Sequence, residues 1–291
     1  MNSLASDHAA CAAVLRQSGS SFALPIRLLP EAKRRGTTAL YAFCRLADDL
    51  VDDASDAVTA RRGLDAFAAR TEAALAGEPS SEPVLRAVVD TARRFAVPVD
   101  YFRDVIAGVR MDLDRVSYGT CAELEEYCRR VASAVGLAAI HIWGFRSPAA
   151  LEAGHHCGLA FQFTNILRDI PEDLGRGRIY LPRTDIETCG CTVADLQAGR
   201  IGPEFGRLAE LQASRTAARY ERAAALDDLL STDGRMVFRA MFGVYRSLFA
   251  AVRRAGPAIF TARVRPTRSR VLASAAATLC LGPRPVRGLW S

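Results

Sequence analysis

A stripe of polar residues on an otherwise apolar helix is the feature that most restricts how this chain can fold. The stripe occupies positions i, i+3, i+7 and i+11 of segment 149–174, which is predicted to be helical; its members are Gln162, Asn165, Asp169 and Asp173. Residues at this spacing lie on one face of a helix. On a strongly apolar helix, such a face is more often turned toward a wet cavity than toward bulk water. We therefore expect helices packed around a polar-lined interior.

Two pairs of aspartates share one spacing. Asp48 and Asp52 are four residues apart, as are Asp169 and Asp173, which follow 121 residues later. Four residues advance a helix by ~6 Å and return to nearly the same face, so each pair would present two carboxylates together. Hard oxygen ligands of this kind bind Mg²⁺ while leaving room for water and substrate phosphates. The pairs predict a site for a diphosphate held through Mg²⁺, with Mn²⁺ as a substitute; the expected metal ligands are Asp48, Asp52, Asp169, Asp173 and, in addition, Asn165.

The same spacing is also compatible with aspartates that bind no metal. Aspartates are common on solvated helix faces, and one isolated pair would be weak evidence for a metal. Pro171 stands inside the second pair, removes a backbone donor and can kink the helix there. The apolar spacing around the first pair nevertheless gives that helix a buried side.

The composition indicates a protein with a sizeable core. Of the 291 residues, 50% are hydrophobic and 24% charged. No apolar run reaches the ~18–20 residues of a membrane span, and the N-terminus lacks a secretion signal, so a cytoplasmic protein is expected. The net charge of +6 comes from scattered arginines. Without a basic-aromatic recognition motif, this charge fits an anionic small molecule or membrane surface better than nucleic acid.

Helical periodicity covers almost the whole chain, and no alternating strand series interrupts it. The predicted helices are 31–53, 61–76, 82–95, 100–115, 121–143, 149–174, 203–230 and 234–254. Segment 271–282 is expected to be a last core helix, with a segment resting on a bilayer surface as the alternative. The predicted fold class is all-α, a single domain over 1–291 whose helices surround a central cavity.

Several long motifs resemble the squalene/phytoene synthase family. They extend in order from about residue 20 to residue 270, and they occupy segments 21–22, 27–30, 40–53, 127–136, 158–169 and 173–182. The resemblance implies an isoprenoid synthase fold and head-to-head condensation of two isoprenyl diphosphates. One substrate would lose its diphosphate to Mg²⁺ and arginines. The double bond of the second would then attack the allylic carbocation, and proton loss would close a cyclopropylcarbinyl diphosphate.

The resemblance also assigns roles to individual residues. Hydrogen bonds to the second diphosphate are expected from Ser21 and Tyr41. Contacts to a diphosphate are expected from Arg45, Arg168 and Arg178, the alternative for each being a salt bridge to a neighbouring aspartate. The expected reaction centre is lined by Tyr127, Gln162 and Tyr180, together with Arg45. The expected boundary of the prenyl channel is formed by Phe22, Phe161, Phe163 and Tyr245.

The motifs divide between two branches of the family. Segments 131–136 and 140–144 resemble bacterial presqualene diphosphate synthases, which use farnesyl diphosphate and stop at the cyclopropyl intermediate. Segment 111–118 resembles phytoene synthases, which use geranylgeranyl diphosphate and continue to phytoene. Many members that complete the second step have a tyrosine where this chain has Arg129 and Arg130. We therefore favour presqualene diphosphate formation, with phytoene, squalene or dehydrosqualene formation as alternatives.

Cofactors and partners follow from the same resemblance. No Gly-rich dinucleotide motif is present, so NADPH is not expected, although squalene synthases bind it without such a motif. Because the product is a lipid, peripheral contact with the inner face of the membrane and with downstream isoprenoid-pathway enzymes is compatible with the sequence. A non-catalytic relative would have lost an aspartate of a pair, and a class I terpene cyclase would lack the Tyr180-Leu181-Pro182 run.

Overall fold

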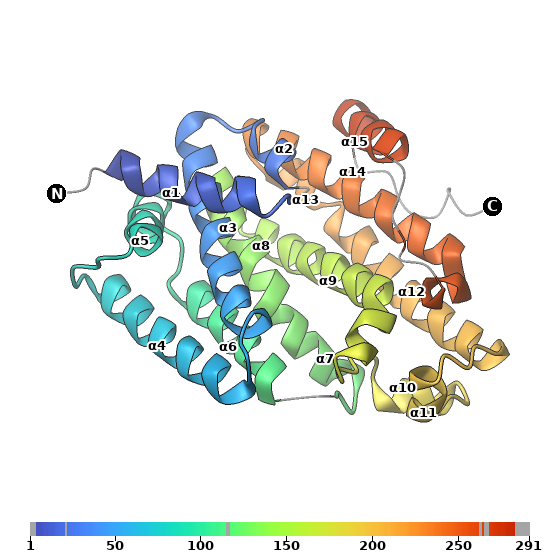
Figure 1. Ribbon diagram of the computed structural model, residues 1–291. Coiled ribbons are helices and arrows are strands. Elements are labelled where there is room, and N and C mark those ends of the chain that lie inside the picture. Colours follow the sequence, from blue (N-terminus) through green and yellow to red (C-terminus); the bar gives the residue numbers. More distant parts are fainter. Residues whose placement is uncertain (1–3, 21, 115–116, 262–263, 265–267, 283–291) are drawn as a thin grey trace. The chain divides into compact units, whose positions relative to one another are not determined.

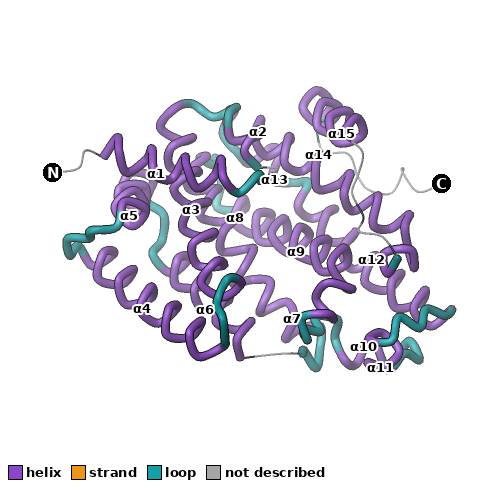
Figure 2. Tube along the Cα trace, viewed as in Figure 1, coloured by secondary structure: helices purple, strands orange, loops and turns teal. Residues whose placement is uncertain are grey.

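Helices make up nearly all of the secondary structure (Figures 1 and 2). The structure, a computed structural model, describes residues 4–20, 22–114, 117–261, 264 and 268–282. Within these ranges, two isolated β-bridges, Ser117 to Ile179 and Phe145 to Leu230, are the departures from helix and loop. The all-α prediction is thereby confirmed.

The chain divides into two compact units. The first comprises residues 1–114, 134–151 and 228–237, and the second comprises 115–133, 152–227 and 238–291. The predicted single domain over 1–291 stays a prediction. The helices of the first unit are α1 (Leu4–Gln17), α2 (Ala23–Ile26), α3 (Glu31–Asp52), α4 (Ala57–Ala76), α5 (Pro83–Phe95), α6 (Asp100–Asp114) and α8 (Ala134–Trp143).

Helices of the second unit include two that begin in the first, α9 and α14. The elements are α7 (Cys121–Cys128), the π-helical turn η1 (Arg129–Ser133), α9 (Ala149–Gly175), α10 (Arg183–Thr188), α11 (Val193–Gln197), α12 (Pro203–Ala223), α13 (Leu226–Leu229), α14 (Thr232–Ala255), the 3-10 turn η2 (Gly256–Phe260) and α15 (Arg268–Leu281).

Helix α3 is the centre of the first unit and packs against α1, α4, α5, α6 and α8. Its apolar face buries Phe43, whose ring centroid lies 5.3 Å from those of both Phe67 in α4 and Phe102 in α6. All three rings are almost fully buried. This aromatic cluster fixes the side of α3 that faces the core, and so the side on which its aspartates stand.

The core of the second unit is built on α9, α12 and α14. Tyr220 of α12 is fully buried and packs against Phe242 and Phe249 of α14, with ring centroids 5.5 and 5.3 Å away. Its hydroxyl is hydrogen-bonded at 2.9 Å to that of Thr164 in α9, which satisfies both buried polar groups. These contacts hold the apolar side of α9 inward.

Most predicted helix boundaries agree with the structure, and two errors have local causes. Helix α4 begins at residue 57 rather than 61 because the Asp56 side chain accepts a hydrogen bond from the Thr59 amide at 2.8 Å and caps it. The predicted helix 203–230 ends at Ala223, and the short α13 follows. The periodicity also missed α1, α10 and α11.

The predicted helix 121–143 is wrong in its middle, where the π-helical turn η1 separates α7 from α8. At this point Gly158 of α9 approaches the backbone so closely that a Cβ on it would lie 2.5 Å from the Ser133 Cα. The Ser133 hydroxyl also donates to the His155 carbonyl oxygen at 3.0 Å. This close contact needs a glycine, and it lies where the α-helical pattern of residues 121–143 is broken.

Most of the side chains that the structure describes in the last helix are exposed. Thr278 of α15 is 2% exposed, but Leu281 is 60% exposed, and Ala273, Ala276 and Ala277 are also exposed. The guanidinium of Arg239 in α14 donates to the Leu279 carbonyl oxygen at 3.0 Å and attaches the helix. Among the described residues, no helix has the length and apolar character needed to cross a membrane.

Candidate active site

The first aspartate pair lies on the last two turns of α3, within the first unit. The Arg45 guanidinium binds Asp49, which stands between the two members, with Nη2 2.5 Å from Oδ1. Asp52 is exposed to solvent, and Asp48 has part of its surface in solvent although protein atoms crowd its carboxyl. The salt bridge expected as an alternative for Arg45 is therefore present, and it is made to Asp49 rather than to a member of the pair.

The Asp48 carboxyl has a strongly raised pKa. Its pKa is raised from 3.8 to about 7, first because the surrounding protein desolvates the carboxyl and then because Asp52 and Asp112 repel its charge. Asp112, on α6, was not predicted as a site residue. It belongs to a run resembling phytoene synthases, but only the packing of α6 against α3 brings it near the pair.

Tyr41 lies two turns before Asp48 on α3. Its hydroxyl donates to Ser18 Oγ at 2.8 Å, and Ser18 in turn donates to the Leu15 carbonyl oxygen at 2.9 Å. The structure therefore gives Tyr41 a partner at the end of α1. Phe22 is half-buried beside α2. Ser21, expected to bind a diphosphate, lies outside the described residues.

The second pair lies near the end of α9, in the second unit. Here the adjacent arginine does contact the pair: Arg168 Nε donates to Asp169 Oδ1 at 2.7 Å, and a second guanidinium nitrogen contacts Oδ2. The Asp169 side chain is 19% exposed and that of Arg168 24%. Charge on this carboxylate is therefore compensated within the protein. The helix continues through Pro171, as predicted for the segment.

Asn165 stands one turn before Asp169. Its Nδ2 lies 3.5 Å from Gln162 Oε1, and its side chain also hydrogen-bonds the Tyr245 hydroxyl. Asn165 Oδ1 is buried without a hydrogen-bond partner among the described residues. An unsatisfied buried oxygen costs free energy unless something binds it. This atom, on the same stripe as Asp169, is suited to bind a cation.

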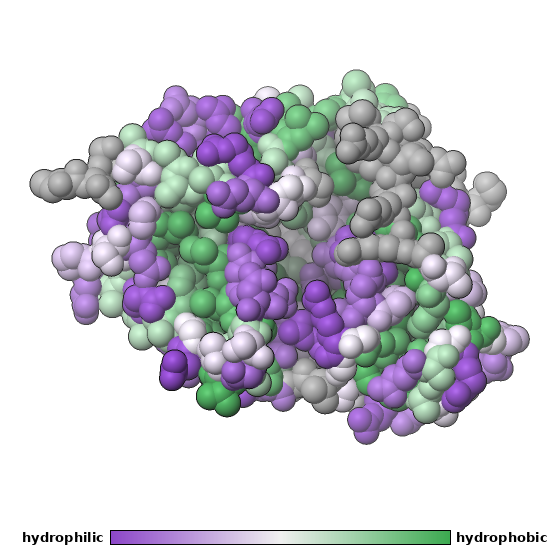
Figure 3. Space-filling view, in the orientation of Figure 1, coloured by the Kyte–Doolittle hydropathy of each residue, from purple (hydrophilic) through white to green (hydrophobic). Residues whose placement is uncertain are grey.

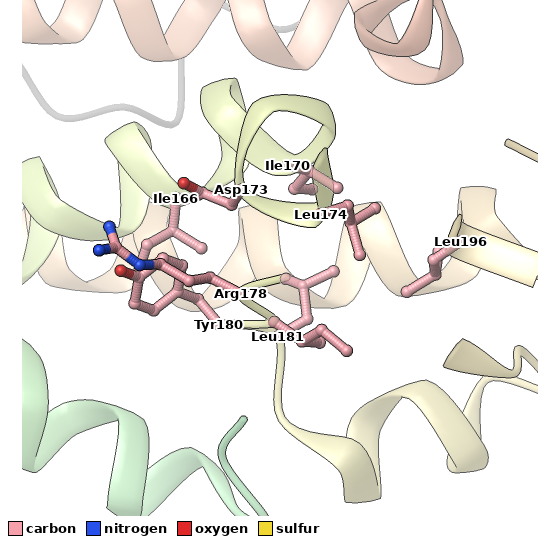
Figure 4. Close-up of a pocket in the computed structure, with 9 residues that line it drawn as sticks. Ile166, Ile170, Asp173, Leu174, Arg178, Tyr180, Leu181 and Leu196 are labelled. Carbon is pink, nitrogen blue, oxygen red and sulfur yellow. The ribbon is translucent and has the colours of Figure 1, made fainter. Parts of the chain in front are cut away.

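Asp173 ends the stripe and lines a small pocket together with Arg178 and Tyr180 (Figure 4). The Arg178 amide donates to the Asp173 carbonyl oxygen at 2.8 Å, so the chain turns back directly after α9. In Figure 4 the Arg178 guanidinium and the Tyr180 hydroxyl point to the same side, away from Leu174, Leu181 and Leu196. The structure thus brings together three of the predicted site residues.

Three tyrosines pack against one another in the second unit. The ring centroids of Tyr127 and Tyr180 are 5.2 Å apart, and the Tyr127 hydroxyl lies 3.4 Å from that of Tyr180. Tyr118, which was not predicted as a site residue, lies 5.4 Å from Tyr127 and 6.0 Å from Tyr180, and it is 1% exposed. The Arg183 amide donates to the Tyr118 carbonyl oxygen at 2.9 Å. Tyr118 therefore packs against both of the predicted tyrosines.

Two further predicted residues also pair. Phe161 of α9 and Tyr245 of α14 stack in parallel, with centroids 3.9 Å apart. Burial raises the pKa of the Tyr245 hydroxyl, and the Asn165 hydrogen bond partly opposes this effect. Phe163, also predicted to bound a prenyl channel, is 5% exposed and has the burial of a core residue.

Arg129 and Arg130, which stand where the family resemblance leads us to expect a tyrosine, are held by one carboxylate. Both Arg129 and Arg130 donate through Nε to Glu126, each at 2.8 Å. These hydrogen bonds lower the pKa of Glu126 to about 2, and the one from Arg129 makes the largest contribution. Arg129 and Arg130 open the π-helical turn, a deviation that is frequent at functional sites.

The donor set of each pair fits Mg²⁺. Within the described ranges, no three His, Cys, Asp or Glu side chains converge as a ready-made metal site. Mg²⁺ bound with substrate phosphates, however, uses one or two protein carboxylates and completes its shell with phosphate and water. The mutual repulsion at Asp48 and the unsatisfied oxygen of Asn165 are both relieved by a cation. Ligand type and spacing therefore suit the ion that the sequence predicts.

Comparison with known proteins shows the family of this chain. The squalene/phytoene synthase family model matches residues 15–270. This chain belongs to that family. It is 36% identical over 266 residues to a phytoene synthase of Arthrospira platensis, covering 87% of this chain and 86% of that protein. Other relatives of similar identity are also named phytoene synthase.

Solved structures show the same fold. A dehydrosqualene synthase in complex with a ligand matches with a TM-score of 0.86 and 29% identity, over 94% of this chain and 95% of that one. A squalene synthase from Alicyclobacillus acidocaldarius matches with a TM-score of 0.81 and 30% identity, over 87% of this chain and 95% of that one. The all-helical isoprenoid synthase fold is thus confirmed, and the chain is a prenyltransferase of this family. The favoured finer assignment, presqualene diphosphate synthase, is not the name that these relatives carry.

Proposed function

We propose that this protein catalyses Mg²⁺-dependent head-to-head condensation of two isoprenyl diphosphates. The observation that carries the proposal is the ion pair between Arg168 and Asp169, next to the unsatisfied Asn165 Oδ1, on the polar stripe of α9. Ionisation of an allylic diphosphate requires stabilisation of the charge that develops on the leaving group. Bound Mg²⁺ would supply that stabilisation at the two aspartate pairs.

The chain's own residues have distinct tasks in this proposal. Arg168 and Arg178 bind the diphosphate, with Arg45 doing the same near the first pair after releasing Asp49. Tyr127 and Tyr180 present hydroxyls and ring faces to the reacting carbons. Aromatic faces attract cations, and an apolar surrounding keeps water away from a carbocation.

The first substrate to test is geranylgeranyl diphosphate, because relatives with 34–36% identity are named phytoene synthase. A second candidate is farnesyl diphosphate with presqualene diphosphate as the end product. It is favoured by Arg129 and Arg130, which Glu126 holds at the positions where many family members have a tyrosine.

The deciding experiment is product analysis with the purified full-length chain, Mg²⁺ and either diphosphate, with and without NADPH. A C40 hydrocarbon from geranylgeranyl diphosphate supports phytoene formation. Presqualene diphosphate that accumulates even with NADPH supports the one-step reaction. Absence of any condensation product from either substrate with Mg²⁺ or Mn²⁺ would overturn the proposal, and activity that persists in EDTA would overturn its metal dependence.

A further inference from the structure

Two leucines at the start of the chain are exposed to solvent although they lie in a well-packed segment. Leu24 is 61% exposed and Leu28 45% exposed, whereas Ile26 and Leu29 between and beside them are 3% and 2% exposed. These are two of only six large hydrophobic side chains exposed among the described residues. The segment therefore has one apolar side in the core and a second apolar side in solvent.

Hydrogen bonds within the segment set which side chains share a side. The amides of Arg27 and Leu28 donate to the carbonyl oxygens of Leu24 and Pro25 at 3.1 and 3.0 Å, and the Leu29 amide donates to that of Ile26 at 3.2 Å. Turning this segment as a unit to bury Leu24 and Leu28 would bring the buried Ile26 and Leu29 toward solvent. Such a turn would exchange one pair of exposed apolar side chains for another.

Basic residues outnumber acidic ones in the sequence around the two leucines. Between residues 22 and 35 the basic residues are Arg27, Lys33, Arg34 and Arg35, against the single acidic residue Glu31. Glu31 is already paired with Arg35 at 2.5 Å, and Lys33 is paired with Asp233 at 2.7 Å. Arg27 and Arg34 are exposed and have no carboxylate partner among the described residues.

Arg34 also lies close to the leucines. Its Nη1 is 3.4 Å from the Leu29 carbonyl oxygen, next to Leu28. In Figure 3, hydrophobic and hydrophilic atoms border one another where Figure 1 labels α2. We name Leu24, Arg27, Leu28 and Arg34 the α2 surface. Exposed apolar side chains close to exposed arginines that have no carboxylate partner in the described part of the chain form a surface that matches the boundary between lipid headgroups and acyl chains.

We propose that the α2 surface docks this protein onto an anionic lipid bilayer, with Leu24 and Leu28 inserted at the headgroup level and Arg27 and Arg34 on lipid phosphates. This interaction is peripheral, and it does not depend on which reaction the protein catalyses. The charge complementarity favours a bilayer over a second copy of the chain, which would bring like charges together.

The test is flotation of the full-length chain, without substrate, with vesicles of phosphatidylcholine alone or of three parts phosphatidylcholine to one part phosphatidylglycerol. We expect binding to the anionic vesicles only. The double variant Leu24→Ser/Leu28→Ser should lose about tenfold or more of the partition coefficient. Arg27→Gln/Arg34→Gln should lose about fivefold for each arginine, and added salt should weaken wild-type binding.

A matched control is available on α4, where Val58 is 75% exposed and Arg62 is also exposed. Val58→Ser/Arg62→Gln removes the same kinds of group and should bind vesicles as the wild type does. Circular dichroism and the melting temperature must match among all variants. Equal binding of the α2 variants and the control would overturn the proposal. So would a wild-type dimer in sedimentation velocity that the leucine variant converts to monomer, since a second copy would then cover the surface.

Discussion

The two aspartate pairs have the same spacing on two helices but opposite electrostatic surroundings. On α3, the neighbouring arginine binds Asp49, and Asp48 is left among carboxylates that raise its pKa to about 7. On α9, the neighbouring arginine binds Asp169 directly through two nitrogens.

This difference shows that the spacing determines which carboxylates share a helix face. The contacts around each carboxylate determine how far its negative charge is compensated. The first pair has excess negative charge that a cation or a proton must neutralise. At the second, a protein cation already neutralises part of the charge and would have to move toward an arriving diphosphate. The pairs are therefore expected to respond differently to mutation of the neighbouring arginine.

The largest expected effect comes from removing one carboxylate of either pair. Asp52→Asn and Asp169→Asn should each lower kcat by about 100-fold or more, because each would remove a proposed ligand of the charge-stabilising metal. Steady-state kinetics with saturating Mg²⁺ measures the loss, and circular dichroism confirms retained helicity. Asp53→Asn, an exposed aspartate next to the first pair, is the matched control and should stay near the wild-type rate. Near-normal activity in Asp52→Asn or Asp169→Asn would remove that residue from the metal site.

A smaller effect is expected from removing the arginine next to each pair, and it should differ between Arg168 and Arg45. Arg168→Gln should lower kcat/KM about tenfold more than Arg45→Gln, because a charge in a less exposed setting interacts more strongly than one near the surface. The Arg168 side chain is 24% exposed and that of Arg45 45%. The Mg²⁺ concentration at half-maximal rate should shift in the Arg168 variant as well, since Asp169 loses its partner. Equal losses in both variants would show that the two pairs use their arginines alike.

The sequence predicted the helices that carry both pairs almost to the residue. The prediction 31–53 compares with Glu31–Asp52, and 149–174 with Ala149–Gly175. Periodicity was sufficient there because each helix has one long apolar face in a core. It failed at residues 129–133, where the π-helical turn lies against Gly158 of another helix. Such a contact leaves no periodic signal in the segment that it distorts.

Site residues within one motif were predictable, and those contributed by a distant segment were not. Asp112 comes near the first pair through the packing of α6 against α3. Tyr118 comes beside Tyr127 and Tyr180, within the second unit, through the backbone pairing of its segment with the chain after α9. Nor could the sequence decide whether Arg45 binds Asp48 or Asp49, because both lie within reach on the helix. That choice depends on side-chain packing, and it produces the contrast between the two pairs.

The raised pKa of Asp48 in the first pair predicts a pH effect on stability. In the unfolded chain this group titrates near 3.8, and in the folded protein near 7. The folded state therefore holds the proton more tightly, and its contribution to stability is lost as pH rises from about 4 to about 7. Without metal, Asp48→Asn should raise the melting temperature more at pH 8 than at pH 5.

Thermal unfolding in EDTA at both pH values tests this, with Asp53→Asn as the control. Mg²⁺ should stabilise the wild type at pH 8 and do so less at pH 5, where a proton competes for Asp48. A melting-temperature difference between Asp48→Asn and wild type that is the same at both pH values would contradict the raised pKa.

The smallest expected effect concerns Pro171, which interrupts the second pair and has no counterpart between Asp48 and Asp52. A proline inside a helix removes the amide that would bond the carbonyl four residues earlier, here that of Leu167. Pro171→Ala restores this donor but increases the freedom of the unfolded chain, so the two contributions partly cancel. We expect a melting temperature higher by a few degrees, with kcat within about threefold of wild type, since α9 is already continuous there. A large loss of kcat at unchanged stability would instead show that proline sets the orientation of Asp169 relative to Asp173, and that equal spacing does not give the two pairs equal geometry.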